Sequence, residues 1–410
     1  MKTLADSAQL KLDLMFDGIR YSDALGRAAG HAFPNFYPYR FKSGEPNPTD
    51  QPKVNIPYLM FLQDETLIRV KGDGSSSWHV EDSDDSGYRL IDDANNENSY
   101  PVQFAPLPDW MKQETSDGFP MAQAGVSLHG DMAVINIAPG CDYFLEKSDS
   151  GTSMRCSFCA YGAPNARVSQ YGQSAGLPGL PASTYERMQQ TLKLALEQSE
   201  IRHIYLVAGS LTDWHEEGVR FMEIARAVQQ VNQHNIPVTC GSGALPLEIM
   251  QQMHGEGLVD SVCFNLEIWS EALFEKVCPG KNKFVGYQQW IESLENAVSL
   301  WGKGRVYSAM VAGIELEPEF AMDWKQAADL AIKGADELCA KGIIPIYSLY
   351  WPVGGQDHPE YFTRLRSYFE RLNLEYQQIR QQQDLQIWHG FMCHRCAYMQ
   401  LECDIDRVKA

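Results

Sequence analysis

The sequence predicts an α/β protein whose central part is a parallel sheet, preceded by a smaller α+β domain. After residue 130, short apolar runs rich in β-branched residues alternate with longer helical patterns. Strands that alternate with helices in this way favour parallel βαβ units over separate α and β layers. The expected strands cover residues 133–137, 203–208, 237–240, 262–267, 305–314 and 343–350.

Helical patterns fill the intervals between these runs. In a barrel of parallel strands, the chemistry gathers where the strands reach their carboxyl ends. The residues that follow each strand are therefore the first place to look for a functional site. Apolar spacing predicts the intervening helices over residues 185–198, 219–233, 246–255, 290–301 and 321–340.

The first 130 residues are long enough to form a separate domain, which we expect to pack on the barrel. The acidic run 81–85 is interpreted as a solvated turn. No catalytic motif is recognised in this part, so we expect it to form a wall or lid over a site built elsewhere. Apolar spacing predicts one helix over residues 10–29, and β-rich pieces follow at 58–62, 66–70, 88–91 and 102–104.

Composition sets the outer limits on function. The chain has 410 residues, 44% of them hydrophobic, which is enough for two or three cores. No apolar run approaches the ~20 residues of a membrane span, and the first residues lack the apolar segment of a signal peptide. The net charge of −19 argues against a nucleic-acid partner, which requires a basic face. Ten cysteines without an export signal predict a cytoplasmic protein with metal-binding or catalytic thiols.

The most informative feature is a loop with three cysteines directly after the first predicted strand: Cys141, Cys156 and Cys159. Three thiolates can hold three corners of a [4Fe–4S] cube and leave the fourth iron open, whereas four cysteines usually close a cluster that only transfers electrons. The Cys-x2-Cys pair alone is also the spacing of zinc sites. The cluster interpretation therefore depends on motifs further along the chain.

This loop resembles that of the radical S-adenosylmethionine (SAM) superfamily. Most members space the ligands as Cys-x3-Cys-x2-Cys with an aromatic or apolar residue before the last cysteine, and Phe158 takes that place. The first gap here is fourteen residues long, which is similar to the long gap of some 7-carboxy-7-deazaguanine synthases. The insert 146–153 is polar and contains a glycine, as is typical of a surface excursion between two ligands.

The resemblance extends to the ends of later strands. The second strand ends in Ala208, Gly209 and Ser210, similar to the small-residue motif whose backbone binds the amino group of SAM, although the usual acid is missing. An ordinary strand-to-helix turn is the alternative. The fourth strand ends with Asn265 and Glu267, similar to the Asn-Leu-Glu of biotin-synthase-like members, whose polar side chains reach SAM. A cap for the next helix is the alternative.

The fifth strand contains Ser308 and Gly313 and is followed by Glu315, where members of the superfamily pack backbone on adenine. The resemblance also implies that Phe158 and Tyr161 flank the adenine. Loops 279–281 and 302–305 match loops of the same subgroup, and their lysines can be explained as solvated side chains. The ordered motifs imply a partial (β/α)6 radical SAM barrel over residues 131–352, after an α+β domain over residues 1–130.

Residues 353–410 predict a helix over 359–383 and then a cysteine-bearing extension. Cys393, Cys396 and Cys403 resemble the auxiliary cluster motifs that follow many radical SAM barrels. A second Fe–S cluster, a zinc site completed by His389 or His394, and three unremarkable cysteines are the open alternatives. Four isolated cysteines are predicted to be small core residues, namely Cys240, Cys263, Cys278 and Cys339.

The resemblance implies an enzyme that holds a [4Fe–4S] cluster on the first three cysteines, binds SAM at the open iron and takes an electron from a flavodoxin or ferredoxin. SAM would be cleaved reductively to a 5′-deoxyadenosyl radical that abstracts hydrogen from a biosynthetic small molecule. Tyr350, Asp357 and His358 are expected to contact that substrate. The alternatives are a peptide-modifying or sulfur-inserting radical SAM enzyme with an auxiliary cluster and, in another class, a non-catalytic zinc- or iron-binding scaffold or sensor.

Overall fold

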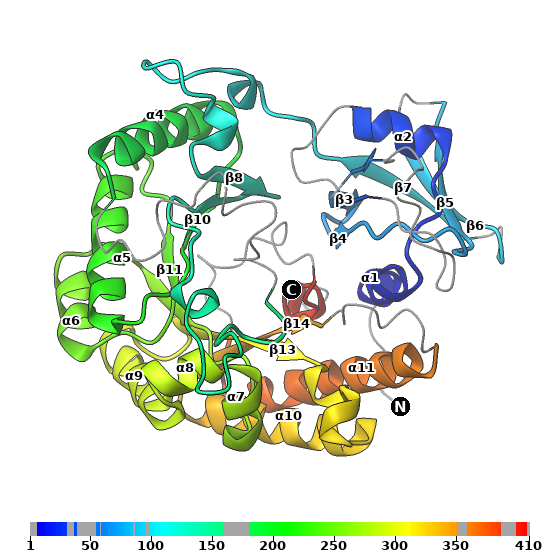
Figure 1. Ribbon diagram of the computed structural model, residues 1–410. Coiled ribbons are helices and arrows are strands. Elements are labelled where there is room, and N and C mark those ends of the chain that lie inside the picture. Colours follow the sequence, from blue (N-terminus) through cyan, green and yellow to red (C-terminus); the bar gives the residue numbers. More distant parts are fainter. Residues whose placement is uncertain are drawn as a thin grey trace.

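The structure is a computed structural model, and two sheets organise it (Figure 1). A curled seven-stranded sheet forms a half barrel, and a five-stranded sheet lies beside it, with α1 (Asp6–Asp17) and α12 (Glu402–Arg407) between the two. The predicted fold class, a partial parallel barrel with an N-terminal α+β part, is confirmed. The structure describes residues 6–30, 37–38, 55–57, 59–84, 87–95, 98–159, 180–350, 359–386 and 399–407.

The large sheet has the strand order β14-β13-β12-β11-β10-β9-β8. Its strands β9 to β14 are parallel and correspond to the strands expected from the sequence, while β8 pairs antiparallel with β9 at one edge and was not expected. The domain boundaries at residues 130 and 352 stay predictions. The strands are β8 (Val126–His129), β9 (Met132–Ile135), β10 (His203–Val207), β11 (Val238–Ser242), β12 (Ser261–Phe264), β13 (Val306–Ala312) and β14 (Ile343–Leu349).

Helices cover the convex face of the half barrel (Figure 1). Asp213 caps the first turn of α5 by accepting backbone N–H groups, and Asp323 forms a capping box with Gln326 at α10. The α-helices are α4 (Ala182–Gln198), α5 (Trp214–Gln229), α6 (Leu247–Gly255), α7 (Glu271–Val277), α8 (Pro279–Phe284), α9 (Tyr287–Trp301), α10 (Trp324–Ala340) and α11 (Pro359–Gln382). The 3₁₀ helices are η1 (Asp109–Lys112), η2 (Met121–Gln123), η3 (Asp142–Phe144), η4 (Ile314–Leu316) and η5 (Pro318–Phe320).

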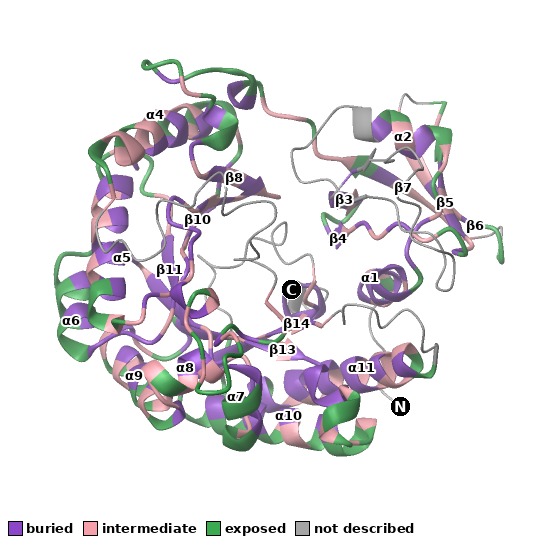
Figure 2. Cartoon of the chain, in the orientation of Figure 1, coloured by how far each residue is buried: buried purple, intermediate pink, exposed green. Residues whose placement is uncertain are grey.

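The core lies between the parallel strands and the helices that cover them (Figure 2). Every residue of β11 and β12 is buried, because a parallel sheet is covered on both faces. This burial is why these strands are continuous apolar or small-residue runs in the sequence, without polar alternation. Among the described residues, no helix is both long enough and apolar enough to cross a membrane.

The smaller sheet is antiparallel, with the order β4-β3-β7-β6-β5. A short antiparallel pair, β1 and β2, is separate from it. The strand β5 was not expected, and the first part of the acidic run, Glu81 and Asp82, belongs to it and not to a turn. The strands are β1 (Tyr37–Pro38), β2 (Asn55–Ile56), β3 (Leu59–Leu62), β4 (Leu67–Arg69), β5 (Trp78–Asp82), β6 (Tyr88–Asp92) and β7 (Ser99–Phe104).

The single helix predicted over residues 10–29 is wrong, because the chain forms α1 and then α2 (Asp23–Gly30). Gly18 lies between them with a positive φ of 68°, a conformation that favours glycine. A Cβ on Gly18 would lie 2.8 Å from the carbonyl oxygen of Lys71, so the chain passes close to the sheet here. Ile19 and Arg20 then pair with the sheet as isolated bridges, which interrupts the helix.

The two ends of the chain are joined by a buried ion pair. Lys11 of α1 and Asp404 of α12 lie 2.6 Å apart between Nζ and Oδ2, and neither side chain is exposed to solvent. Arg366 of α11 also pairs with Asp13 of α1. The N-terminal helix is therefore held on the C-terminal elements of the half barrel as well as on its own sheet.

Candidate active site

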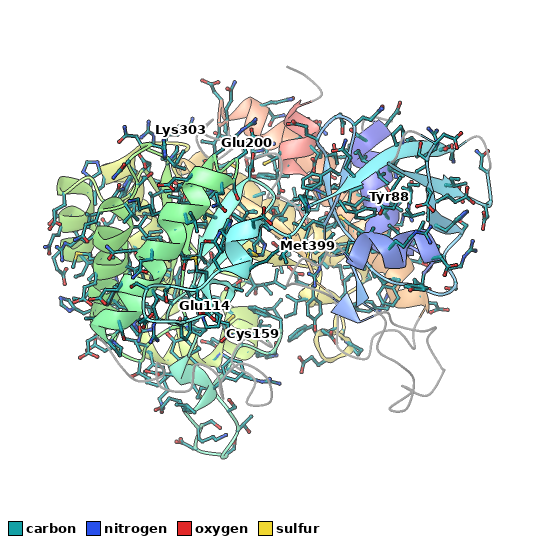
Figure 3. The ribbon with its side chains drawn as sticks, turned by 90° about the horizontal axis from the view of Figure 1, so that it is seen from above. Tyr88, Glu114, Cys159, Glu200, Lys303 and Met399 are labelled. Carbon is teal, nitrogen blue, oxygen red and sulfur yellow. The ribbon has the colours of Figure 1, made fainter. Side chains whose placement is uncertain are left out.

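The three cysteines of the predicted cluster loop follow β9 at the carboxyl end of the parallel strands. Figure 3 shows Cys159 on one side of the molecule and Glu200 and Lys303, which precede β10 and β13, on the opposite side. Cys141 and Cys159 are half-buried, and Cys156 is buried. The predicted ligands thus share the end of the barrel where chemistry is expected.

The backbone after β10 fixes the position of Cys141. The N–H of Asp142 donates to the carbonyl of Ser210 (2.9 Å), and the N–H of Gly209 donates to Ala138 (2.8 Å). A Cβ on Gly209 would lie 2.7 Å from the nitrogen of Cys141 and still closer to the carbonyl of Gly140. Glycine is therefore needed at this turn because the cluster loop itself approaches it.

The long insert between the first two cysteines forms a hairpin. Backbone bonds join Ser148 to Thr152 (2.8 Å) and Met154 to Glu146 (3.0 Å), and most of the tip is exposed, which confirms the predicted surface excursion. Tyr143 stacks on Phe284 of α8 with ring centroids 5.6 Å apart and planes 2° apart. The hairpin thereby returns the chain and lets Cys156 lie near Cys141 despite the fourteen residues between them.

Electrostatics couple the three thiols. Burial raises the pKa of Cys141 to about 12, and the neighbouring Cys156 and Cys159 add to this effect because a second negative charge close by is unfavourable. A hydrogen bond from Cys278 is the main cause that lowers the pKa of Cys156. Cys156 therefore becomes a thiolate, the form that binds metal, more readily than Cys141 does.

The donor set fits an iron–sulfur cluster, because thiolates are the soft ligands that such clusters take and each iron binds its own thiolate. Cys141, Cys156 and Cys159 would hold it. Within the described ranges, no three His, Cys, Asp or Glu side chains surround a common point as ligands of one metal ion would.

A buried cation lies beside these thiols. Lys281 of α8 is 7% exposed, so the explanation of this lysine as a solvated side chain is wrong. Its Nζ lies 2.7 Å from Oε1 of Glu267, donates to the carbonyl of Asn265 and stands 4.6 Å from the ring centroid of Trp290. Burial disfavours the ammonium form, but Glu267 and Cys156 outweigh it and hold the pKa of Lys281 above its ordinary value.

The end of β12 does not cap the next helix. Ser270 is the N-cap of α7, and its hydroxyl accepts the N–H of Leu273. Asn265 instead accepts a hydrogen bond from the thiol of Cys263 (3.3 Å) through its side-chain oxygen, and Glu267 holds Lys281. The two polar residues are therefore turned toward the strand ends and the buried lysine, beside the cluster loop.

The other predicted cofactor residues are more dispersed. Phe158, Ala208 and Ser210 are half-buried around the cluster loop. The hydroxyl of Ser308 accepts the N–H of Leu266 (3.0 Å), so it braces the end of β12. At Gly313, with φ of 101°, an added Cβ would strike Leu365 of α11, so this glycine faces the helix behind the sheet.

The structure describes only some of the residues that were predicted at the last strand and in the tail. Tyr350 is half-buried, and its N–H donates to Ala312 (2.9 Å). Cys403 is buried at the start of α12. Their roles stay predictions, as does the cysteine site of the tail. The remaining predicted residues lie outside the described residues: Tyr161, Asp357, His358, Cys393 and Cys396, with the possible zinc ligands His389 and His394.

Two charged residues of α5 that sequence reasoning did not single out organise the strand ends. The carboxylate of buried Glu217 accepts the N–H groups of Leu211 (2.9 Å) and Gly243 (2.9 Å), which joins the turns after β10 and β11. Buried Arg220 donates to the carbonyl of Gly209 (3.3 Å). In the sequence these residues look like any charged pair on a helix, and only their spacing of three residues, which sets them on one face, hints at a shared role.

Comparison with known proteins gives distant likenesses. No family model matches the sequence. A bacteriochlorophyllide c C-7(1)-hydroxylase from Chlorobaculum limnaeum is 22% identical over 260 residues, which are 60% of this chain and 59% of the hydroxylase. The chain therefore spans less than two thirds of the length of this curated relative.

The solved structures that resemble the chain do so at low similarity. A radical SAM methyltransferase from Sphaerobacter thermophilus is 13% identical, with 74% of this chain and 76% of that chain covered and a TM-score of 0.37. HydG, a maturase of the [FeFe]-hydrogenase, is 14% identical, with 65% and 57% covered and a TM-score of 0.40.

The motifs and the fold agree on one resemblance. A three-cysteine loop after the first parallel strand, a glycine turn after the second and an Asn-Leu-Glu sequence after the fourth lie on one end of a parallel half barrel. These features are similar to those of the radical SAM superfamily.

Proposed function

We propose that this protein is a radical SAM enzyme that holds a [4Fe–4S] cluster on Cys141, Cys156 and Cys159, binds SAM beside it and abstracts hydrogen from a small-molecule substrate. The observation that carries the proposal is the convergence of these thiols at the carboxyl end of the half barrel, although fourteen residues separate the first two. When bound, a cluster with an open iron supplies the low-potential electron for reductive cleavage of SAM.

The residues around the thiols have the properties that such chemistry requires. Lys281 places a buried positive charge beside the thiolates, which offsets part of their negative charge. Gly209 and Arg220 fix the turn against which the cluster loop rests. Asn265 and Glu267 are the residues that we propose to bind polar groups of SAM. A rigid, largely buried surround of this kind orients the reactants and excludes water.

A small molecule is the substrate class that we favour. The curated relative is named as a hydroxylase of a bacteriochlorophyllide, which is a small molecule, and it supports this choice at 22% identity. Tyr350, Asp357 and His358 are the residues that we propose to contact the substrate. A flavodoxin or ferredoxin is the proposed electron donor.

The experiment is anaerobic reconstitution of the full chain with iron and sulfide, followed by reduction with dithionite in the presence of SAM. We expect three to four irons per chain from this site and the release of 5′-deoxyadenosine. Cys339→Ser is the matched control, because Cys339 is a buried cysteine of α10 outside the site, and it should behave as the wild type does. Bound metal without 5′-deoxyadenosine would instead support the scaffold or sensor.

Iron counting also tests the C-terminal cysteines. If they hold a second cluster, replacing Cys393, Cys396 and Cys403 together should remove about four irons and leave SAM cleavage in place. An unchanged iron content would exclude the auxiliary cluster, and with it the sulfur-inserting and cluster-assisted peptide-modifying alternatives.

A further inference from the structure

A fourth cysteine, Cys278, lies against the cluster loop. It stands at the junction of α7 and α8, is completely buried, and forms a side-chain hydrogen bond with Cys156. Nothing in the three-ligand motif assigns it a role. Once the sulfur of Cys156 binds iron it is a thiolate without a proton, so Cys278 is the partner that donates.

Backbone bonds hold this pair together from both sides. The N–H of Ser157 donates to the carbonyl of Val277 (2.8 Å), and the N–H of Gly280 donates to Met154 (2.9 Å). A Cβ on Gly280 would lie 2.7 Å from the carbonyl of Met154, so no larger residue fits between the helix junction and the loop. The residues on either side of Cys156 and of Cys278 are thus clamped to each other, and the thiol contact is part of the fold.

A buried cation lies close to both sulfurs of the pair. Lys281, three residues after Cys278, acts on both sulfurs, and its own counter-ion Glu267 is 2.7 Å away. Because the site is buried, water does not screen these interactions as it would at the surface. The reduction potential of an Fe–S cluster depends on hydrogen bonds to its sulfurs, on the net charge around it and on its exposure to solvent.

We propose that Cys278 is a positioning residue that donates an S–H···S hydrogen bond to the ligand sulfur of Cys156 and thereby raises the reduction potential of the cluster. The inference rests on the proposed function, because it requires the cluster. A donor to the sulfur withdraws negative charge from it and makes the added electron easier to accept. Lys281 acts in the same direction through its charge.

The test is a redox titration of the anaerobically reconstituted full chain without SAM, monitored by electron paramagnetic resonance, with iron and sulfide measured on the same samples. Cys278→Ala should keep the iron content and lower the ratio of reduced to oxidised cluster about tenfold at the wild-type midpoint, ~59 mV for a one-electron couple. Cys278→Ser keeps a donor and should restore most of that ratio. Cys339→Ala, at another buried cysteine, should leave it unchanged.

Three results would overturn the inference, and they are distinguishable. If the Cys278→Ala protein had full iron and the wild-type midpoint, Cys278 would be an ordinary core residue. A Cys278→Ala protein that loses iron would make Cys278 a ligand. A wild-type chain that binds no cluster would refute the proposed function itself, before any variant is compared.

Discussion

Replacing Gly209 by alanine tests whether the turn after β10 positions the cluster loop. The new Cβ would lie 2.7 Å from the nitrogen of Cys141 and closer still to two atoms of Gly140, although real Cβ atoms essentially never approach within 3.0 Å. All three obstructing atoms belong to the backbone, so no side-chain rotation can relieve the clash. The loop that carries the first cysteine has to move.

The size of that movement decides the expected effect. The nitrogen of Cys141 has to retreat from 2.7 Å to at least 3.0 Å, a shift that already exceeds the ~0.2 Å within which metal–ligand distances are held. Overpacking of this kind costs about 1–3 kcal/mol of the free energy of unfolding. We therefore expect Gly209→Ala to lower the urea midpoint and to reduce iron loading more than tenfold at limiting iron.

The assay compares urea denaturation and iron content after anaerobic reconstitution with those of Gly255→Ala. Gly255 ends α6, is exposed and has no atom within 4 Å of an added Cβ, so alanine there should be neutral or stabilise by up to about 1 kcal/mol. If Gly209→Ala loaded iron fully and unfolded at the wild-type midpoint, the turn would not position the loop.

Two further predictions concern buried charges away from the thiols. Lys11→Met removes the buried cation that pairs with Asp404 and should cost about 3–5 kcal/mol of unfolding free energy. Most of this loss should be recovered in Lys11→Met/Asp404→Leu. By the same urea assay, Arg20→Ala in an exposed pair should cost under about 1 kcal/mol. Burial raises the pKa of Glu315 from 4.5 to about 7, so the folded chain binds the extra proton between these values; its contribution to stability is greatest below pH 4.5 and falls as the pH rises toward 7. Glu315→Gln should therefore gain stability relative to the wild type between pH 5 and pH 8, and a constant difference across that range would contradict the assignment.

The parallel strands were predictable because burial on both faces makes them continuous runs that the helical segments separate. Every residue of β11 and β12 is buried, and no polar alternation confuses the pattern. The strand β5 was missed for the opposite reason. It begins with buried Trp78 but ends in exposed Glu81 and Asp82, so half of it has the composition of a turn.

The positions of the three cysteines and Gly209 at the strand ends were predictable, because the sequence places them directly after predicted parallel strands. The site was not predictable where tertiary packing alone gives a residue its role. Lys281 and Cys278 are ordinary in sequence, and they become notable only because α8 packs on a loop more than a hundred residues earlier in the chain. The positive φ of Gly313 and its contact with Leu365 account for a glycine there, and its role toward a cofactor stays a prediction.

The most direct measurement of the central claim is the amount of 5′-deoxyadenosine formed from SAM by the reduced, reconstituted full chain and by the single variants Cys141→Ala, Cys156→Ala and Cys159→Ala. The wild type and Cys339→Ser should form it at equal rates, and each of the three variants should fall to the rate without protein. Turnover at the wild-type rate in any one of the three would show that the sulfur removed is not needed, and would contradict the account of this site.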